Sequence, residues 1–192
     1  MLRRSLLVTG FGPFPGVEHN PSREIAKALA SRGIGADVEI TAAELPVAFA
    51  EVAPAIDAVL ARMTRAPDVL LGIGVWGHGD SFRLERRARG VFDTTRADNA
   101  GATGAGIDLG PERSTNFDLA ALAECMRVAG AGVVKLSEDA GSYVCERTYL
   151  HLLTRAEDLG ARALFLHIPP VEVIGLERQI ACVTALAREI FR

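Results

Sequence analysis

Two side chains, Cys145 and His167, are of the types that carry out nucleophilic catalysis through sulfur. The thiolate is the attacking species, and a histidine within reach serves as its base. Cys145 follows Gly141 and falls in the opening turn of an expected helix, where unpaired backbone amides and the positive end of the helix dipole favour a negative charge. We therefore expect a lowered pKa for the Cys145 thiol and a nucleophilic role for it, with His167 as its base.

Each candidate also has a purely structural interpretation at this point. Cys145 could be a small buried apolar side chain, and His167 could end a strand with its ring hydrogen-bonded in the core. Glu85 could orient the histidine as the third member of a triad, or it could be a solvent-facing charge paired with neighbouring arginines. Cys125 and Cys182 fall inside amphipathic helices, so a core position is expected for both.

The number and spacing of the cysteines and histidines indicate no metal site. The three cysteines are odd in number and widely spaced, with no Cys-x-x-Cys pair, so neither a disulfide framework nor a zinc site is indicated. His19, His78 and His151 are not at ligand spacing, and surface or capping roles are expected for them. Residues 10–14 form a glycine-rich loop with two phenylalanines and no P-loop lysine, which favours an apolar pocket wall over a phosphate site.

The elements that must position these side chains follow from hydrophobic periodicity and from helix and turn signals. In the expected strand 68–75, the residues after Asp68 are apolar, as in a central strand buried on both faces, whereas 82–92 alternates and is expected to be exposed or at an edge. Pro54 predicts a kink or break in its helix, and the long loop 93–115 could cover a site. The other expected strands are 5–9, 37–41, 133–136 and 163–168, and the expected helices are 20–33, 47–63, 117–129, 142–159 and 171–191.

Short strands that alternate with alanine-rich helices indicate an α/β fold with a parallel core. If residues 133–167 form one right-handed β-α-β crossover, Cys145 and His167 both lie at the carboxyl edge of the sheet. The loops after Thr9 and Val75 open at the same edge, where open α/β sheets bind their ligands. A site that contains one thiol and one imidazole is therefore expected there.

Composition limits the class of protein. The chain has 192 residues, of which 49% are hydrophobic and 23% charged, as expected for one globular domain spanning residues 1–192. The apolar runs 69–76 and 163–168 are too short to cross a bilayer, and residues 5–8 are too short for a signal-peptide core, so we expect a cytoplasmic protein. The net charge of −3 and the interruption of the basic run 83–89 by Glu85 argue against nucleic-acid binding.

Several short segments occur in an order that is typical of one protein family. They are residues 9–14 (TGFGPF), 20–21 (NP), 45–47 (LPV), 84–86 (LER), 98–101 (DNAG), 137–145 (SEDAGSYVC) and 167–169 (HIP). Together they resemble the pyroglutamyl peptidases, which remove an N-terminal pyroglutamyl residue from peptides, and the resemblance covers nearly the whole chain. It implies a single-domain three-layer α/β/α sandwich with a mostly parallel central sheet, of the phosphorylase/hydrolase-like kind.

The resemblance also implies a catalytic apparatus and a substrate. Cys145 would be the nucleophile, His167 the general base and acid, and Glu85 the residue that orients the imidazole. Attack on the pyroglutamyl carbonyl would give a thioester that water hydrolyses, without a cofactor. The partner would be a peptide with N-terminal pyroglutamate, and the chain would form a homodimer or homotetramer. The residues implied to bind the substrate are Phe11, Phe14, Asn20, Val75, Tyr143 and Val144.

The sequence departs from the usual pattern of this family around the expected pocket. Gly90 and Glu146 stand where asparagine is usual, Val75 stands where glutamine is common, and the usual arginine of the loop before Glu85 is replaced near Gly79. Two alternatives therefore remain. One is a divergent member whose altered pocket hydrolyses or binds another small amide or lactam compound. The other is a nucleoside-phosphorylase-like enzyme, which would need a basic phosphate site that no motif supplies.

Overall fold

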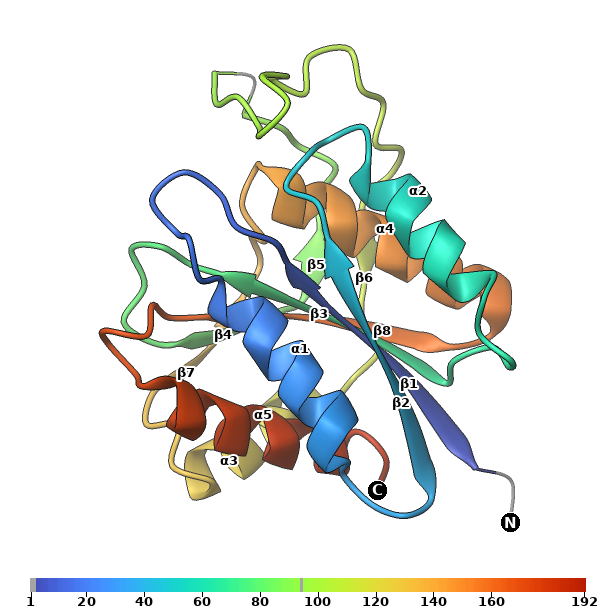
Figure 1. Cartoon of the computed structure of the whole chain (residues 1–192), viewed down its shortest axis with the longest axis vertical. Coiled ribbons are helices and arrows are strands. Elements are labelled where there is room, and N and C mark those ends of the chain that lie inside the picture. The colour runs from blue at the N-terminus through green and yellow to red at the C-terminus, as the bar shows by residue number, and fades with distance from the viewer. Residues whose placement is uncertain (1–2, 94) are drawn as a thin grey trace.

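The computed structural model describes residues 3–93 and 95–192, which form one α/β domain around a six-stranded sheet (Figure 1). In spatial order the strands are β2 (Val38–Leu45), β1 (Arg4–Phe11), β3 (Val69–Val75), β8 (Arg162–Ile168), β4 (Phe82–Glu85) and β7 (Val134–Ser137). Strands β5 (Arg87–Ala88) and β6 (Arg113–Ser114) pair separately as a short antiparallel ribbon.

Helices cover both faces of the sheet, which confirms the expected three-layer α/β/α sandwich. One layer contains α1 (Pro21–Arg32), α3 (Leu119–Val128) and α5 (Leu176–Glu189), and the other contains α2 (Val52–Leu60) and α4 (Val144–Leu159) (Figure 1). Each layer encloses its own apolar cluster against the sheet. On β3, for example, Leu71 belongs to the cluster under α1, α3 and α5, and Leu70 belongs to the one under α2 and α4.

The first loop and helix form as the sequence predicts, and they fix one wall of the later site. The Asn20 side chain caps α1 by accepting a hydrogen bond from the Ser22 backbone N–H at 3.1 Å, and Pro21 occupies the first helical position. Gly33 ends the helix with a φ of 70°, a conformation that favours glycine. Asn20 also donates to the Gly12 carbonyl at 3.0 Å, so the cap ties down the loop after β1.

Two helices begin about five residues later than predicted. Helix α2 starts at Val52, so Pro54 lies in its first turn, where a backbone N–H has no intrahelical partner to lose. The predicted kink or break at Pro54 is therefore wrong. The last helix starts at Leu176 rather than at residue 171, after a turn in which the Val173 N–H donates to the Pro170 carbonyl.

The placement of β4 corrects the prediction of an exposed or edge strand at 82–92. Strand β4 ends at Glu85 and lies between β8 and β7, with the side chains of Phe82, Leu84 and Glu85 fully buried. The edge position on this side of the sheet belongs to β7, where Leu136 is exposed. The alternation was misleading because Glu85 is a buried charged residue and not a solvent-facing one.

The direction of β7 corrects the predicted crossover. Strand β4 pairs in parallel with β7 and antiparallel with β8, so β7 runs opposite to β8. The rule on right-handed crossovers applies only to parallel strands, and it therefore does not apply to residues 133–167. After β7, residues 138–143 return to the carboxyl end of β8 before α4 begins, and Cys145 reaches the expected edge by this different route.

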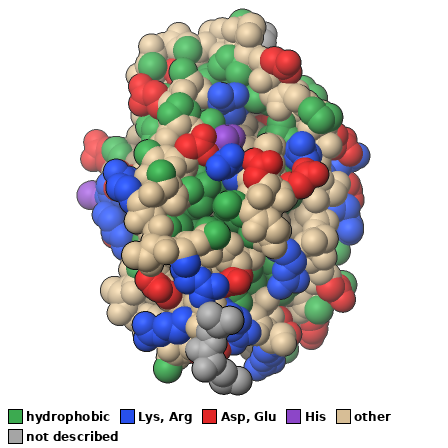
Figure 2. Space-filling view, turned by 90° about the vertical axis from the view of Figure 1, so that its right-hand side faces the viewer, with side chains coloured by type: hydrophobic (Ala, Val, Ile, Leu, Met, Phe, Trp, Pro, Cys, Tyr) green, Lys and Arg blue, Asp and Glu red, His purple; other side chains and the backbone are tan. Residues whose placement is uncertain are grey.

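The long loop was correctly predicted. Apart from the short strand β6, the described residues of the predicted loop 93–115 contain no helix or strand, and much of this loop lies above the α2 and α4 layer in Figure 1. On the face drawn in Figure 2, acidic and basic side chains are interspersed. Among the described residues, no helix has the length and apolarity needed to cross a bilayer.

Candidate active site

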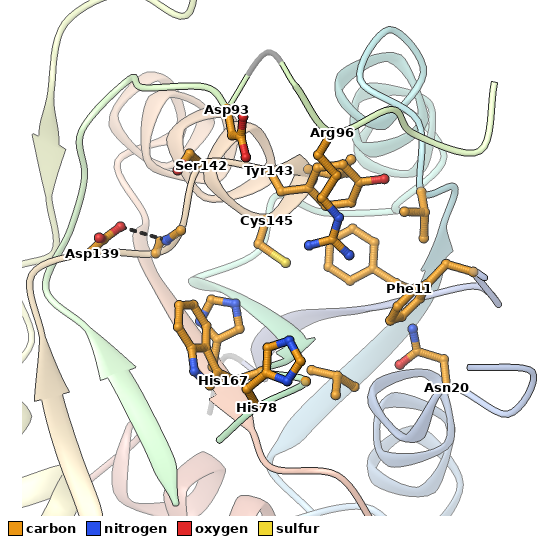
Figure 3. A pocket seen from close by; sticks show the side chains of 18 residues that line it. Phe11, Asn20, His78, Asp93, Arg96, Asp139, Ser142, Tyr143, Cys145 and His167 are labelled. Atoms are coloured by element: carbon orange, nitrogen blue, oxygen red, sulfur yellow. Dashed lines mark hydrogen bonds between the residues drawn. The ribbon is translucent and has the colours of Figure 1, made fainter. Parts of the chain in front are cut away.

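A pocket opens at the carboxyl ends of β1, β3 and β8, and the loops that follow these strands form much of its wall (Figure 3). Cys145 and His167 both line it, as the sequence predicted. All six residues predicted to bind the substrate line it as well. The full lining is Phe11, Phe14, Asn20, Val47, Val75, Trp76, Gly77, His78, Asp93, Arg96, Asp139, Ala140, Gly141, Ser142, Tyr143, Val144, Cys145 and His167.

Glu85 is held against His167 by the pairing of two strands. Arg83 on β4 lies opposite His167 on β8, and Glu85 is two residues further along, so all three side chains share one face of the sheet. The Glu85 Oε1 atom is 2.8 Å from His167 Nδ1, and both side chains are almost completely buried. The solvent-facing interpretation of Glu85 is therefore wrong, although an arginine does contact it, through Arg83 Nε at 3.3 Å.

Glycines on β3 make room for the thiol. Cys145 is the second residue of α4, and a Cβ atom added to Gly74 would lie only 2.9 Å from Cys145 Sγ. The neighbouring Gly72 faces the Phe165 ring in the same way, at 2.4 Å. Within residues 3–93 and 95–192, Sγ and the His167 ring share the pocket without a hydrogen bond between them. The sulfur is thus tightly enclosed on the sheet side and open only toward the pocket.

The predicted lowering of the thiol pKa is wrong for this site. Burial raises the pKa of Cys145 to about 12, and the negative charge of Glu85 acts in the same direction. The nearby Arg96 guanidinium and the Cys145 backbone N–H lower the pKa, but they do not outweigh the loss of solvation. At neutral pH the sulfur therefore carries its proton, and a base must remove that proton when the sulfur attacks.

The wall on one side of Cys145 combines aromatic rings with a loop amide and a guanidinium. In Figure 3, Phe11, Asn20, Tyr143 and Arg96 lie to that side of the sulfur, and Asp139 lies to the other. The Tyr143 hydroxyl donates to the Ala97 carbonyl at 2.9 Å, which joins the helix start to the long loop. The polar atoms of Asn20 are already used within its own loop, so its direct effect is on the shape of the wall.

Several lining residues were missed by sequence reasoning. Arg96 stacks over the Tyr143 ring, with its guanidinium carbon 4.1 Å from the ring centroid, and Asp93 lies nearby. Both belong to the long loop that was expected to cover a site, so its length was the available signal. Trp76 and His78 follow the central strand, where only their position at the carboxyl end could have indicated them.

Three departures from the usual family pattern have a structural explanation. The Glu146 side chain is buried behind the nucleophile, and its Oε1 atom accepts hydrogen bonds from the Arg89 N–H and, at 2.7 Å, from the Gly90 N–H. Gly90 has a φ of 72°, so glycine suits the turn that presents these donors. At Gly79, an added Cβ would lie 2.5 Å from Cδ1 of Trp76, so the indole excludes a side chain there.

The other cysteines lie away from the pocket. Cys182 is fully buried in α5, as predicted. Cys125 in α3 is partly exposed, and its Sγ donates to the Ala185 carbonyl at 3.4 Å, so it packs at the boundary of the core. Among the described residues, no group of three or more His, Cys, Asp or Glu side chains is arranged to hold a metal ion.

Comparisons with known proteins give a consistent result. Residues 4–188 match the family model described as pyroglutamyl peptidase. A pyrrolidone-carboxylate peptidase from Clavibacter michiganensis is 34% identical over 181 residues, which cover 91% of this chain and 83% of that protein. A pyrrolidone-carboxylate peptidase 1 from Ralstonia nicotianae is 34% identical over 179 residues, which cover 89% and 81% of the two chains.

Solved structures agree with the sequence matches. The pyrrolidone carboxyl peptidase from Fervidobacterium islandicum aligns with a TM-score of 0.89 at 27% identity, over 98% of this chain and 99% of that one. The pyrrolidone carboxyl peptidase from Thermococcus litoralis shares the fold, with a TM-score of 0.86 at 22% identity over 98% and 96% of the two chains. With the family model, the relatives and the fold in agreement, this chain belongs to the pyroglutamyl peptidase family of cysteine peptidases.

Proposed function

We propose that this chain removes N-terminal pyroglutamate from peptides through a Cys145–His167–Glu85 triad. The observation that carries the proposal is the buried 2.8 Å contact between Glu85 and His167 beside a thiol at a helix start, all within one pocket. A carboxylate on Nδ1 leaves Nε2 free to accept a proton, which is the tautomer that a general base needs. The catalytic domain is proposed to be the whole chain, residues 1–192.

The reaction begins with a protonated thiol. Because burial raises the pKa of Cys145 to about 12, His167 accepts the thiol proton as Sγ attacks the pyroglutamyl carbonyl carbon. The carbonyl oxygen gains the negative charge and is stabilised by the backbone N–H groups of Val144 and Cys145, which begin α4 ahead of its first intrahelical hydrogen bonds. Glu85 stabilises the imidazolium that forms.

The second half of the reaction returns the enzyme to its starting state. His167 gives its proton to the departing amine, the carbon–nitrogen bond breaks, and a thioester remains on Cys145. Water then attacks the thioester, with His167 accepting one of its protons. The carbon–sulfur bond breaks, the sulfur regains a proton from His167, and free pyroglutamate leaves.

The pocket matches the chemistry of a lactam ring. An uncharged five-membered ring needs an apolar slot with a few hydrogen-bonding groups, and no counter-ion. Phe11, Phe14, Tyr143 and Val144 supply such a slot beside the nucleophile. Val75 lines it as well, where the family commonly has glutamine, so this wall offers one polar group fewer than is usual. The predicted homodimer or homotetramer and the cytoplasmic location stay predictions.

The proposal is tested with a fluorogenic L-pyroglutamyl amide and the matching L-prolyl amide, in reducing buffer. Proline has the same ring size but a charged amine in place of the lactam, so only the pyroglutamyl compound should be cleaved. Cys145→Ala should abolish turnover, and Cys125→Ala, which removes a thiol outside the pocket, should retain it. A folded parent that cleaves neither compound would contradict the proposal and favour the divergent member with another small amide or lactam as its ligand.

A further inference from the structure

An aromatic wall closes the side of the pocket beyond His167. Trp76 lines the pocket, is only partly buried, and packs edge-to-face with His167 at 5.2 Å between ring centroids. A Cβ on Gly141 would lie 3.6 Å from its Cζ3 atom, in van der Waals contact, so the indole lies directly beside the nucleophile loop. None of the three catalytic roles proposed above uses this side chain.

The position of the indole is fixed from three sides. The Arg83 guanidinium carbon stacks 3.9 Å from its ring centroid, and the Trp76 backbone N–H donates to the Ile168 carbonyl at 2.9 Å. The Gly79 N–H donates back to the Trp76 carbonyl at 2.9 Å, and an added Cβ at Gly79 would overlap the ring. The backbone of Trp76 and one face of its indole are therefore both held in place, as a preformed binding surface requires.

Arg83 is itself held rigidly. Its Nη2 atom donates to the Ser137 hydroxyl at 2.6 Å and to the Asp139 carbonyl at 3.1 Å, and its Nε atom contacts Glu85. Only the planar, forked guanidinium can make these contacts and stack on an indole at the same time. Arg83 is thus a positioning residue for Trp76.

The proposed reaction decides which part of a substrate meets this wall. The ring of pyroglutamate occupies the side of Cys145 where Phe11 lies in Figure 3. The departing amine must receive its proton from His167, on the other side of the sulfur. The peptide beyond that amine therefore passes along Trp76. The carboxylate at the rim there, Asp139, is paired with Arg89, which reduces its attraction for a basic side chain.

We propose that Trp76, positioned by Arg83, binds the residue that follows pyroglutamate and favours an aromatic side chain at that position. This inference rests on the proposed function, because it defines the second residue of a pyroglutamyl peptide. One face of the indole is taken by Arg83, and the surface left open toward the pocket offers apolar, π-rich area for stacking. A glycine in the second position of the peptide has no side chain that could stack on this surface.

The test compares cleavage of pyroglutamyl-phenylalanine amide with cleavage of pyroglutamyl-glycine amide. The parent should prefer the phenylalanine peptide by about tenfold in kcat/KM, mainly through a lower KM. A preference of this size is what one aromatic contact supplies. Trp76→Ala should reduce this ratio to within about twofold, Trp76→Phe should restore most of it, and Arg83→Met should lower it partly. A parent without preference, or a preference that survives in Trp76→Ala, overturns the proposal.

The chain offers a second readout that needs no turnover, because Trp76 is its single tryptophan. In the Cys145→Ala variant, tryptophan emission should change on titration with the phenylalanine peptide at about tenfold lower concentration than with the glycine peptide. Unchanged emission at concentrations above the parent's KM overturns the proposal. Failure of the proposed function is a different result, in which the parent cleaves neither peptide nor the fluorogenic amide.

Discussion

Glu85 and His167 meet at 2.8 Å although they lie on strands that run in opposite directions. The register of β4 against β8 places Glu85 opposite Phe165, and a one-residue slip would turn its carboxylate to the other face of the sheet. The Tyr149 hydroxyl donates to the Glu85 backbone carbonyl at 2.8 Å and ties the same position to α4. The contact is therefore fixed by a sheet ladder and a helix together.

Glu85→Gln should keep the fold and lose most of the activity. The amide can donate a hydrogen bond to Nδ1 of His167, which places the ring proton on Nε2 and leaves no base for the thiol. We expect kcat to fall by about 10²–10⁴-fold, as for the equivalent change in a serine triad. The far-ultraviolet circular dichroism should not change. A kcat within about threefold of the parent would show that Glu85 does not set the tautomer.

The raised pKa of Cys145 should appear in the stability of the protein at alkaline pH. Above about pH 8.5 the unfolded chain loses the thiol proton while the folded chain keeps it up to about pH 12, so the free energy of unfolding falls as pH rises. Urea unfolding of the parent should lose about 1–2 kcal/mol more than Cys145→Ala between about pH 8 and 10. Equal losses in the two proteins would contradict a raised thiol pKa.

Gly74→Ala tests the close fit of the nucleophile. The new methyl group would lie 2.9 Å from Cys145 Sγ and 3.1 Å from the Phe165 ring, so the sulfur must move. Displacement of a reacting atom by a fraction of an ångström should lower kcat/KM by about tenfold or more. Gly175→Ala is the matched control, because a Cβ there meets nothing within 4 Å. Similar activities of the two variants would show that Sγ is free to shift.

Glu146→Gln should stabilise the protein at neutral and alkaline pH. Burial raises the pKa of Glu146, so ionisation costs more in the folded chain than in the unfolded chain, and stability falls as pH rises above the ordinary glutamate range. Glutamine keeps an acceptor for the Gly90 N–H without a charge. Thermal unfolding at about pH 8 should give a gain on the order of 1 kcal/mol, with none near pH 4. A loss at pH 8 would contradict the expected burial cost.

Tyr143→Phe should weaken substrate binding without stopping the chemistry. It removes the 2.9 Å hydrogen bond to the Ala97 carbonyl, which holds the long loop against the start of α4, but it keeps the ring in the pocket wall. KM for the pyroglutamyl amide should rise by about threefold to tenfold, with kcat changed less than about twofold. A lowered kcat at unchanged KM would instead place the hydroxyl in the chemical step.

Local signals predicted the elements that depend on local chemistry. The Asn20 cap, the Gly33 stop and the apolar strand β3 each have a cause within a few neighbouring residues, and all three were found. The direction in which a strand runs has no cause within a few neighbouring residues. Nothing within β7 itself indicates whether it runs with or against β8, because that choice depends on its pairing with β4.

The site shows the same division. Cys145 and His167 were placed at one edge because a helix start and a strand end are local features, even though the supposed crossover was wrong. The pattern around Glu85 predicted a solvent-exposed strand because burial of a carboxylate is normally unfavourable, and here it is compensated by contacts from other strands. Trp76 and Arg83 approach each other only in the folded chain, so their contact was not predictable.

The loop that leads into β4 can differ in length without changing where the Glu85 carboxylate lies, because β4 is placed by its pairing with β8 and β7. Residues 77–81 connect β3 to β4 at the pocket rim, while the position of Glu85 is set downstream by pairing with β8 and β7. Insertions or deletions in this connection would change the entrance to the pocket without moving the carboxylate. Evolution or a protein engineer can therefore vary substrate choice there while the acid–base pair stays intact.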